Sequence, residues 1–355
     1  MNDRERFLRT MTYQDVDRVP FWDFGFWDET LTAWHDQGLP EDVWLDSYFG
    51  MDRQWEHFPI NLGMIPAFDE VVIEDRGISE VVVDSLGRKL ERRKDGSSIP
   101  HFIEFPVKTR ADWERLKKRY DPTSPKRLPE HFAEVVACKR RRDYAMGVTC
   151  GSLYGWTRDL MGVENLSVAF YDDPGLVRDI MHHWADLAIA NITPVLEALP
   201  VDYGSFWEDM AFNHGPLISP ALFREFMIPE YQRITDVLHA HGVKVIYVDC
   251  DGRIDELLPL WLEAGVNTMF PWEVRCNDDP SEWRRKMGRD LLIIGAIDKM
   301  ALIAGREAID AEVKRRIPLM REGGYIPVVD HRVPPDVTLD NYKYYLDVLR
   351  RAIER

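Results

Sequence analysis

A pair of carboxylates stands at the end of an apolar run in the second half of the chain. Asp249 and Asp251 flank Cys250, Gly252 comes next, and residues 243–248 before them read Val-Lys-Val-Ile-Tyr-Val. A strand-like run that stops on acidic residues and a glycine predicts two carboxylates at the carboxyl end of a buried strand. Enzymes with parallel sheets build their active sites at that edge.

Six other apolar runs end in polar residues in the same way. They cover residues 19–23, 145–150, 201–209, 267–273, 291–298 and 325–331, and they bring the candidate residues Asp23, Glu208, Asp209, Glu273, Asp298 and His331 to strand ends. Apolar residues at helical spacing occupy residues 174–196, 220–241, 254–263, 307–321 and 339–353. Strands and helices therefore alternate, which predicts a parallel sheet with crossover helices.

Two parallel architectures are compatible with this alternation. A doubly wound sheet usually carries a glycine-rich phosphate turn, and the chain has neither G-x-G-x-x-G nor a P-loop. A closed barrel collects residues from many strand ends into one mouth. The acidic residues at most strand ends favour a single (β/α)8 TIM-type barrel over residues 1–355, with all of these side chains at the mouth.

The interval of about 25–144 departs from the alternation. Residues 71–74, 79–84 and 88–93 predict a three-stranded antiparallel meander, because Gly77 and Gly87 lie between them. We interpret the interval as a helical and meander insertion near the barrel mouth. Its aromatic residues either line a substrate wall or, as we favour, pack a small helical subdomain; they are Trp27, Trp34, Trp44, Tyr48, Phe49 and Trp55.

Composition restricts the classes of partner and compartment. The chain of 355 residues has a net charge of −16, which disfavours binding to nucleic acid or to an anionic membrane. The four cysteines have no C-x-x-C spacing, and the start of the chain lacks the pattern of a signal peptide. We therefore expect a cytoplasmic protein with reduced thiols.

Ordered motifs extend over nearly the whole chain and resemble a known superfamily. They are residues 4–7 (Arg-Glu-Arg-Phe), 17–20 (Asp-Arg-Val-Pro), 155–162 (Gly-Trp-Thr-Arg-Asp-Leu-Met-Gly), 215–220 (Gly-Pro-Leu-Ile-Ser-Pro), 249–252 and 331–336 (His-Arg-Val-Pro-Pro-Asp). Together they resemble the uroporphyrinogen decarboxylase superfamily, which includes the haem-pathway decarboxylase and corrinoid-linked methyltransferases.

The resemblance favours the methyltransferase branch. The decarboxylases carry an arginine-rich stretch that holds the substrate carboxylates, and residues 23–27 (Asp-Phe-Gly-Phe-Trp) occupy its place here. A substrate with many carboxylates would be repelled by an acidic mouth without that arginine clamp. By position, Asp23 and Trp27 are candidate substrate contacts, and so is Asp298.

The methyltransferases resembled here hold zinc with a His-x-Cys pair and a later Cys. Those positions fall on Asp249, Asp251 and His331, which are all able to bind a metal. Oxygen and nitrogen ligands suit zinc and also harder ions such as manganese or iron(II). We expect a divalent metal, zinc first, with Glu208, Asp209 and Glu273 as catalytic carboxylates, and whether Cys250 or Cys276 joins them stays open.

Three functions follow in order of preference. The first is metal-assisted methyl transfer from a small O- or N-methylated compound to a corrinoid, which the resemblance places on a separate partner protein. The second is metal-free uroporphyrinogen decarboxylation, and the third is a non-catalytic, ligand-binding barrel. A homodimer is compatible with each. A plainer interpretation of Asp249 and Asp251 is that they cap a helix beginning near Arg253.

Overall fold

The centre of the molecule is a curled, parallel sheet of seven strands. The computed structural model describes residues 1–96 and 99–354. In spatial order the strands are β1 (Glu56–His57), β6 (Met146–Thr149), β7 (Tyr203–Trp207), β10 (Val245–Asp249), β11 (Thr268–Trp272), β12 (Leu292–Ile297) and β13 (Tyr325–Val329). β12 is buried along its whole length. Such burial on both faces explains why these strands read as continuous apolar runs.

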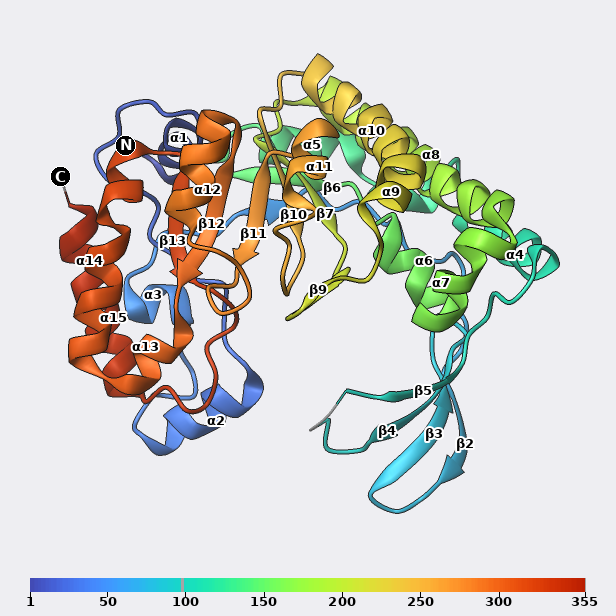
Figure 1. The fold of residues 1–355 in the computed structure, drawn as a ribbon, viewed down its shortest axis with the longest axis horizontal. Coiled ribbons are helices and arrows are strands. Elements are labelled where there is room, and N and C mark those ends of the chain that lie inside the picture. The colour runs from blue at the N-terminus through green and yellow to red at the C-terminus, as the bar shows by residue number, and fades with distance from the viewer. Residues whose placement is uncertain (97–98, 355) are drawn as a thin grey trace.

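Helices surround the sheet, and α1, which contacts β13, packs at its inner face (Figure 1). They are α1 (Asp3–Met11), α2 (Asp28–Asp36), α3 (Leu45–Phe49), α4 (Arg110–Leu116), α5 (Phe132–Lys139), α6 (Tyr154–Met161), α7 (Val163–Asp172), α8 (Pro174–Ala198), α9 (Pro220–Leu222), α10 (Ile228–Ala240), α11 (Leu258–Glu263), α12 (Pro280–Met287), α13 (Lys299–Ala304), α14 (Arg306–Glu322) and α15 (Leu339–Ile353). A π-helical turn, Phe223–Met227, joins α9 to α10. In the described part of the chain, no helix is long and apolar enough to cross a membrane.

The prediction of a regular strand at residues 19–23 is wrong. This segment forms no ladder, although Asp52 N–H donates to the Phe21 carbonyl and Val329 N–H donates to the Asp23 carboxylate. Pro20 has no N–H to give to a ladder, and the Asp23 side chain takes a bond that a backbone carbonyl would otherwise accept. The sheet therefore has seven parallel strands instead of the predicted eight. Residues 19–23 contact the chain at or beside the two edge strands, β1 and β13.

A four-stranded antiparallel sheet replaces the predicted three-stranded meander. Its strands are β2 (Val71–Asp75), β3 (Ser79–Val83), β4 (Lys89–Arg93) and β5 (His101–Glu104), in that order. It projects from the body beside α6 and α7 in Figure 1, where Arg88 forms an ion pair with Asp159 on α6. β1 lies inside the interval of 25–144 yet pairs with β6, so that interval also contributes to the main sheet.

Two apolar clusters meet across the sheet. The smaller cluster, on the inner face, contains Phe7 and Met11 of α1 together with residues such as Tyr203, Tyr247 and Phe270. The larger one packs the outer face against the helices. Of the aromatic residues near the start of the chain, Trp34 and Phe49 pack in this outer cluster, as we favoured, whereas Trp55 contacts the inner one.

Candidate active site

Three carboxylates converge where β7 and β10 end. Asp209, Asp249 and Asp251 each offer one oxygen, and these oxygens all lie within 4.8 Å of one another. Oδ1 of Asp209 and Oδ1 of Asp251 are buried without a hydrogen-bond partner among the described residues. Buried polar atoms are normally paired, so these two oxygens indicate a site built for a ligand.

The ionisation of this acidic cluster is perturbed in the direction that crowding predicts. Burial, followed by the charge of Asp251, raises the pKa of Asp209 to about 6. Burial, followed by the charges of Asp251 and Asp209, raises the pKa of Asp249 well above its usual range. Three carboxylates at such distances cannot all ionise without cost unless a cation or a proton lies among them.

Backbone strain accompanies the cluster. Asp209 has a φ of 42°, a left-handed conformation that is uncommon for residues other than glycine. Arg158 of α6 donates to the Asp209 carbonyl and helps to hold this turn. Strained residues gather at functional sites, which favours a functional role for Asp209 over a structural one.

His331 lies beside the cluster. Its Nε2 is 3.3 Å from Oδ2 of Asp251, its ring stacks on Trp27 with a centroid distance of 5.5 Å, and Phe24 packs against the ring edge. Burial opposes protonation of His331, but the Asp251 carboxylate outweighs it and raises the pKa of the imidazole. His331 can therefore hold a proton near neutral pH or, once deprotonated, offer a nitrogen to a metal.

Glu273 and Lys299 form a second charged group next to His331. The Lys299 ammonium lies 3.2 Å from Glu273 and 3.4 Å from Asp330, and Gly252 N–H donates to the other Glu273 oxygen. The adjacent Asp298 is not among these contacts of Lys299. The structure instead pairs Asp298 with Arg275, and Asp298 also accepts from Met300 N–H as the N-cap of α13.

The remaining predicted residues have different surroundings. Asp23 is buried and accepts from Phe24 N–H, Val329 N–H and the Tyr342 hydroxyl, and burial raises its pKa to about 6. These contacts favour a structural role that ties residues 19–26 to β13 and α15. Trp27 is 41% exposed and flanks His331, so it remains accessible to a ligand.

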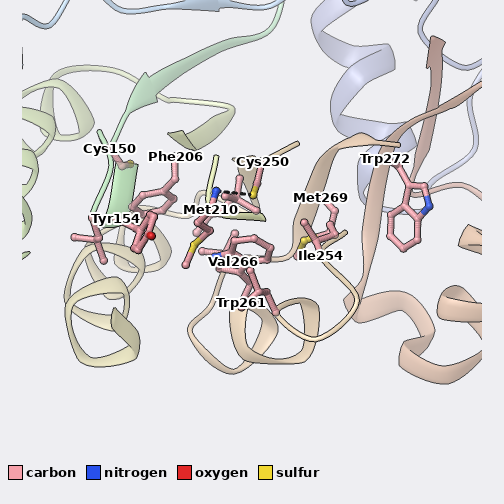
Figure 2. Packing of buried hydrophobic residues seen from close by; sticks show 14 of the residues in the cluster. Cys150, Tyr154, Phe206, Met210, Cys250, Ile254, Trp261, Val266, Met269 and Trp272 are labelled. Carbon is pink, nitrogen blue, oxygen red and sulfur yellow. Dashed lines mark hydrogen bonds between the residues drawn. The ribbon is translucent and has the colours of Figure 1, made fainter. Parts of the chain in front are cut away.

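Cys250 faces away from the carboxylates into the outer cluster. Figure 2 shows its sulfur beside Met210, and Met210 N–H donates to that sulfur. Cys276 is partly exposed, and burial raises the pKa of its thiol to about 11.

Neither Asp249 nor Asp251 caps a helix, because α11 begins only at Leu258 and its N-cap, Leu257, makes no side-chain cap bond.

Glu208 is fully buried and surrounded by donors. Its carboxylate accepts from the Ser152 hydroxyl, from the N–H groups of Leu153, Tyr154 and Gly155, and from the Tyr231 hydroxyl at 2.6 Å. Burial raises its pKa in spite of these bonds. The arrangement suits an anchor for the start of α6 better than a proton donor.

We expect Glu208→Ala to destabilise the fold by about 3 kcal/mol or more, because several buried donors lose their acceptor together. The midpoint of urea unfolding measures the loss. Glu197→Ala, an exposed position on α8, is the matched control and should change stability little. An unchanged midpoint for Glu208→Ala would show that this carboxylate is not an anchor.

Comparison with known proteins agrees with this architecture. The family model "Uroporphyrinogen decarboxylase (URO-D)" matches residues 79–352. The uroporphyrinogen decarboxylase of Streptomyces coelicolor is 26% identical over 226 residues, which span 60% of this chain and 58% of that enzyme. That of Hydrogenovibrio crunogenus is 21% identical over 352 residues, spanning 94% of this chain and 92% of the other.

A solved structure, a methyltransferase from Methanosarcina mazei, superimposes with a TM-score of 0.61 at 14% identity, covering 99% of each chain. At that identity the likeness concerns the fold alone. The family match, in contrast, covers most of the chain and includes β6 to β13 and the acidic cluster. The protein belongs to the uroporphyrinogen decarboxylase family.

Proposed function

We propose that the chain transfers a methyl group from a small O- or N-methylated compound to a corrinoid carried on a partner protein. The observation that carries the proposal is the convergence of Asp209, Asp249 and Asp251 with two buried oxygens that have no partner. A further part of the proposal is that residues 19–26, which contact the chain beside both edge strands without forming a strand, close the curled seven-stranded sheet into a barrel around this site.

The carboxylates suit a divalent cation, with Asp249 and Asp251 as ligands and Asp209 or His331 as the third. When bound, such an ion would polarise the heteroatom that carries the methyl group. Hard oxygen donors suit zinc, manganese or iron(II). The raised pKa values of Asp209 and Asp249 support the same conclusion, since a cation would relieve the repulsion between these groups.

The chain's own residues supply the proton that the reaction needs. When the carbon–heteroatom bond breaks, its electron pair stays on the heteroatom, which must then gain a proton to leave as an alcohol or amine. His331 carries a proton at a raised pKa next to Asp251, and Trp27 limits its movement by stacking. Glu273 is ion-paired with Lys299, and we assign its carboxylate to positioning Lys299 rather than to donating this proton.

Uroporphyrinogen decarboxylation is the second candidate, because the curated relatives carry that name. The acidic cluster argues against it, since a substrate rich in carboxylates would be repelled there.

Two assays of the purified protein separate the candidates. One uses uroporphyrinogen, the other uses a reduced corrinoid protein with a panel of methyl donors, and elemental analysis measures the metal content. We expect bound metal and methyl transfer; efficient formation of coproporphyrinogen would overturn the proposal.

His331→Ala separates three roles for this residue. If His331 binds the metal, metal content and activity fall together while the fold survives. If it is the proton donor, activity falls and metal content is kept, which is the result we expect if Asp209 completes the ligand set. A lower melting temperature with normal activity per folded molecule would assign His331 to structure alone.

A further inference from the structure

A second polar group lies on the inner face of the sheet, apart from the acidic cluster. His57 ends β1, and its Nε2 is 2.7 Å from the Ser205 hydroxyl oxygen and 3.5 Å from the Tyr247 hydroxyl oxygen. The imidazole packs edge-on against Tyr203 at a centroid distance of 5.4 Å. The sequence motifs assign none of these side chains a functional role, and the proposed chemistry does not use them.

The position of this group relative to the acidic cluster follows from the strand register. Ser205 pairs with Tyr247 across β7 and β10, and the pair two residues further along is Trp207 with Asp249. Residues two apart on a strand point to the same face and lie about 6.6 Å apart along it. The His57 group therefore lies one layer deeper than Asp249 on the same face of the sheet.

Solvent reaches His57 although its neighbours are buried. Its side chain is exposed, whereas Tyr203 and Tyr247 are almost fully covered. Protein atoms nevertheless surround the ring closely, and this burial lowers the pKa of His57 to about 4. The imidazole is thus reachable by a small molecule and uncharged at neutral pH.

The hydrogen-bonding capacity of His57 is only half used. Nε2 contacts Ser205 and Tyr247, while Nδ1 makes no hydrogen bond to any residue in the ranges 1–96 and 99–354. A neutral imidazole has one donor and one acceptor nitrogen, and the direction of the Ser205 hydroxyl proton decides which of them is Nδ1. An oxygen that can donate as well as accept satisfies either arrangement.

Aromatic side chains form the surroundings of this group. Trp55 stacks on Tyr247 at a centroid distance of 4.6 Å, and Phe270 packs edge-on against Trp55 at 5.4 Å. Among the described residues, no hydrogen bond or ion pair joins His57 to a charged side chain, so an ionised ligand group would lose its hydration there without gaining an ion pair. The surroundings favour an uncharged polar group.

We propose that His57, positioned by Ser205 and Tyr247, binds an uncharged oxygen function, a hydroxyl or carbonyl, at the far end of the methyl donor. This inference rests on the proposed function and names a feature of its substrate. The methylated heteroatom would lie at the acidic cluster and the second oxygen about one layer deeper. A donor with its oxygen at that spacing is then preferred over one that lacks it.

Two matched probes test the spacing. One is a straight-chain methyl ether with a terminal hydroxyl four methylene groups from the ether oxygen, and the other has a methyl group in place of the hydroxyl. Their dissociation constants for the metal-loaded protein are measured by ligand-observed NMR titration without corrinoid, so that binding is read independently of methyl transfer. We expect the hydroxylated ether to bind about tenfold more tightly, because its hydroxyl forms a hydrogen bond with His57 that the methyl probe does not form.

His57→Leu should reduce the ratio of the two probes' dissociation constants to about one. Ser205→Ala, which frees the imidazole to rotate, should reduce this ratio in part. Ser205→Ala also serves as the second variant if His57→Leu does not fold. His239→Leu, at an exposed position on α10, is the control and should keep the wild-type ratio.

Equal ratios in wild type and His57→Leu, or no preference in wild type, would overturn the inference. A preference that depends on His57 in a protein without methyl transfer would uphold the subsite and remove the proposed function instead.

Discussion

Asp249→Asn should abolish metal binding and methyl transfer together while leaving the fold intact. The substitution keeps the shape of the side chain but removes its charge from a position within 4.8 Å of two other carboxylates. Mutating outer partners of metal ligands already costs roughly 10–100-fold in affinity or activity, and a ligand itself should cost at least as much. Elemental analysis after dialysis and the initial rate of corrinoid methylation measure the two losses.

The matched control for this prediction is Asp236→Asn on α10. Asp236 is exposed and lies far along the helix from the acidic cluster, so the same chemical change should leave metal content and rate unaltered. Full metal content and full activity in Asp249→Asn would show that the centre of the site is elsewhere. Loss of activity with metal retained would assign Asp249 to the substrate instead.

The regular elements of the fold were predictable because their residues are buried in simple patterns. β10 and β12 lie within the predicted apolar runs, and α15 spans Leu339–Ile353 as its spacing predicts. β1 was missed because its two residues, Glu56 and His57, carry no apolar signal. Its pairing with β6 depends on residues far away in the chain, which a local pattern does not contain.

Side-chain bonds to the backbone account for the other differences. The helix expected from residue 254 begins at Leu258, because Asn277 accepts from Ile254 N–H and Glu273 accepts from Gly252 N–H. These bonds hold residues 252–254 in a loop beside the site, and residues 255–257 form a turn that leads into α11. Sequence patterns do not show such contacts, since both acceptors come from the end of the following strand.

The candidate site could be located from the sequence but not divided into roles. Glu208 and Asp209 are adjacent at one strand end, and only the structure separates the donor-saturated Glu208 from Asp209, which turns toward Asp251 through a positive φ. His57 offered no signal at all, because its partners Ser205 and Tyr247 lie on two other strands.

Asp209→Asn should stabilise the metal-free protein at neutral pH. The folded-state pKa of Asp209 is about 6, above that of an unfolded aspartate near 3.9, so the folded chain binds more protons between these values. Stability is therefore lost as the pH rises through this window, and the full penalty is present at pH 7. Asparagine has no charge to bury and tolerates the left-handed backbone.

The expected gain at pH 7 is about 1–3 kcal/mol, since one pKa unit corresponds to about 1.4 kcal/mol and partial solvation lowers the effect. Urea unfolding in the presence of a chelator should show this gain at pH 7 and almost no gain near pH 3, where the Asp209 carboxyl is protonated in both the folded and the unfolded state. Asp236→Asn, whose carboxylate is exposed, should show no difference at either pH.

Adding a divalent metal should reverse the order of stability. The wild type gains free energy from binding, by about 2.7 kcal/mol when the metal is at one hundred times its dissociation constant, while Asp209→Asn gains less because one carboxylate is missing. A variant that is no more stable than the wild type in chelator would mean that the three carboxylates are not strained by mutual repulsion. If the order reverses with metal, the instability of the empty site and its affinity for a cation have the same cause, which is uncompensated negative charge in a partly buried site.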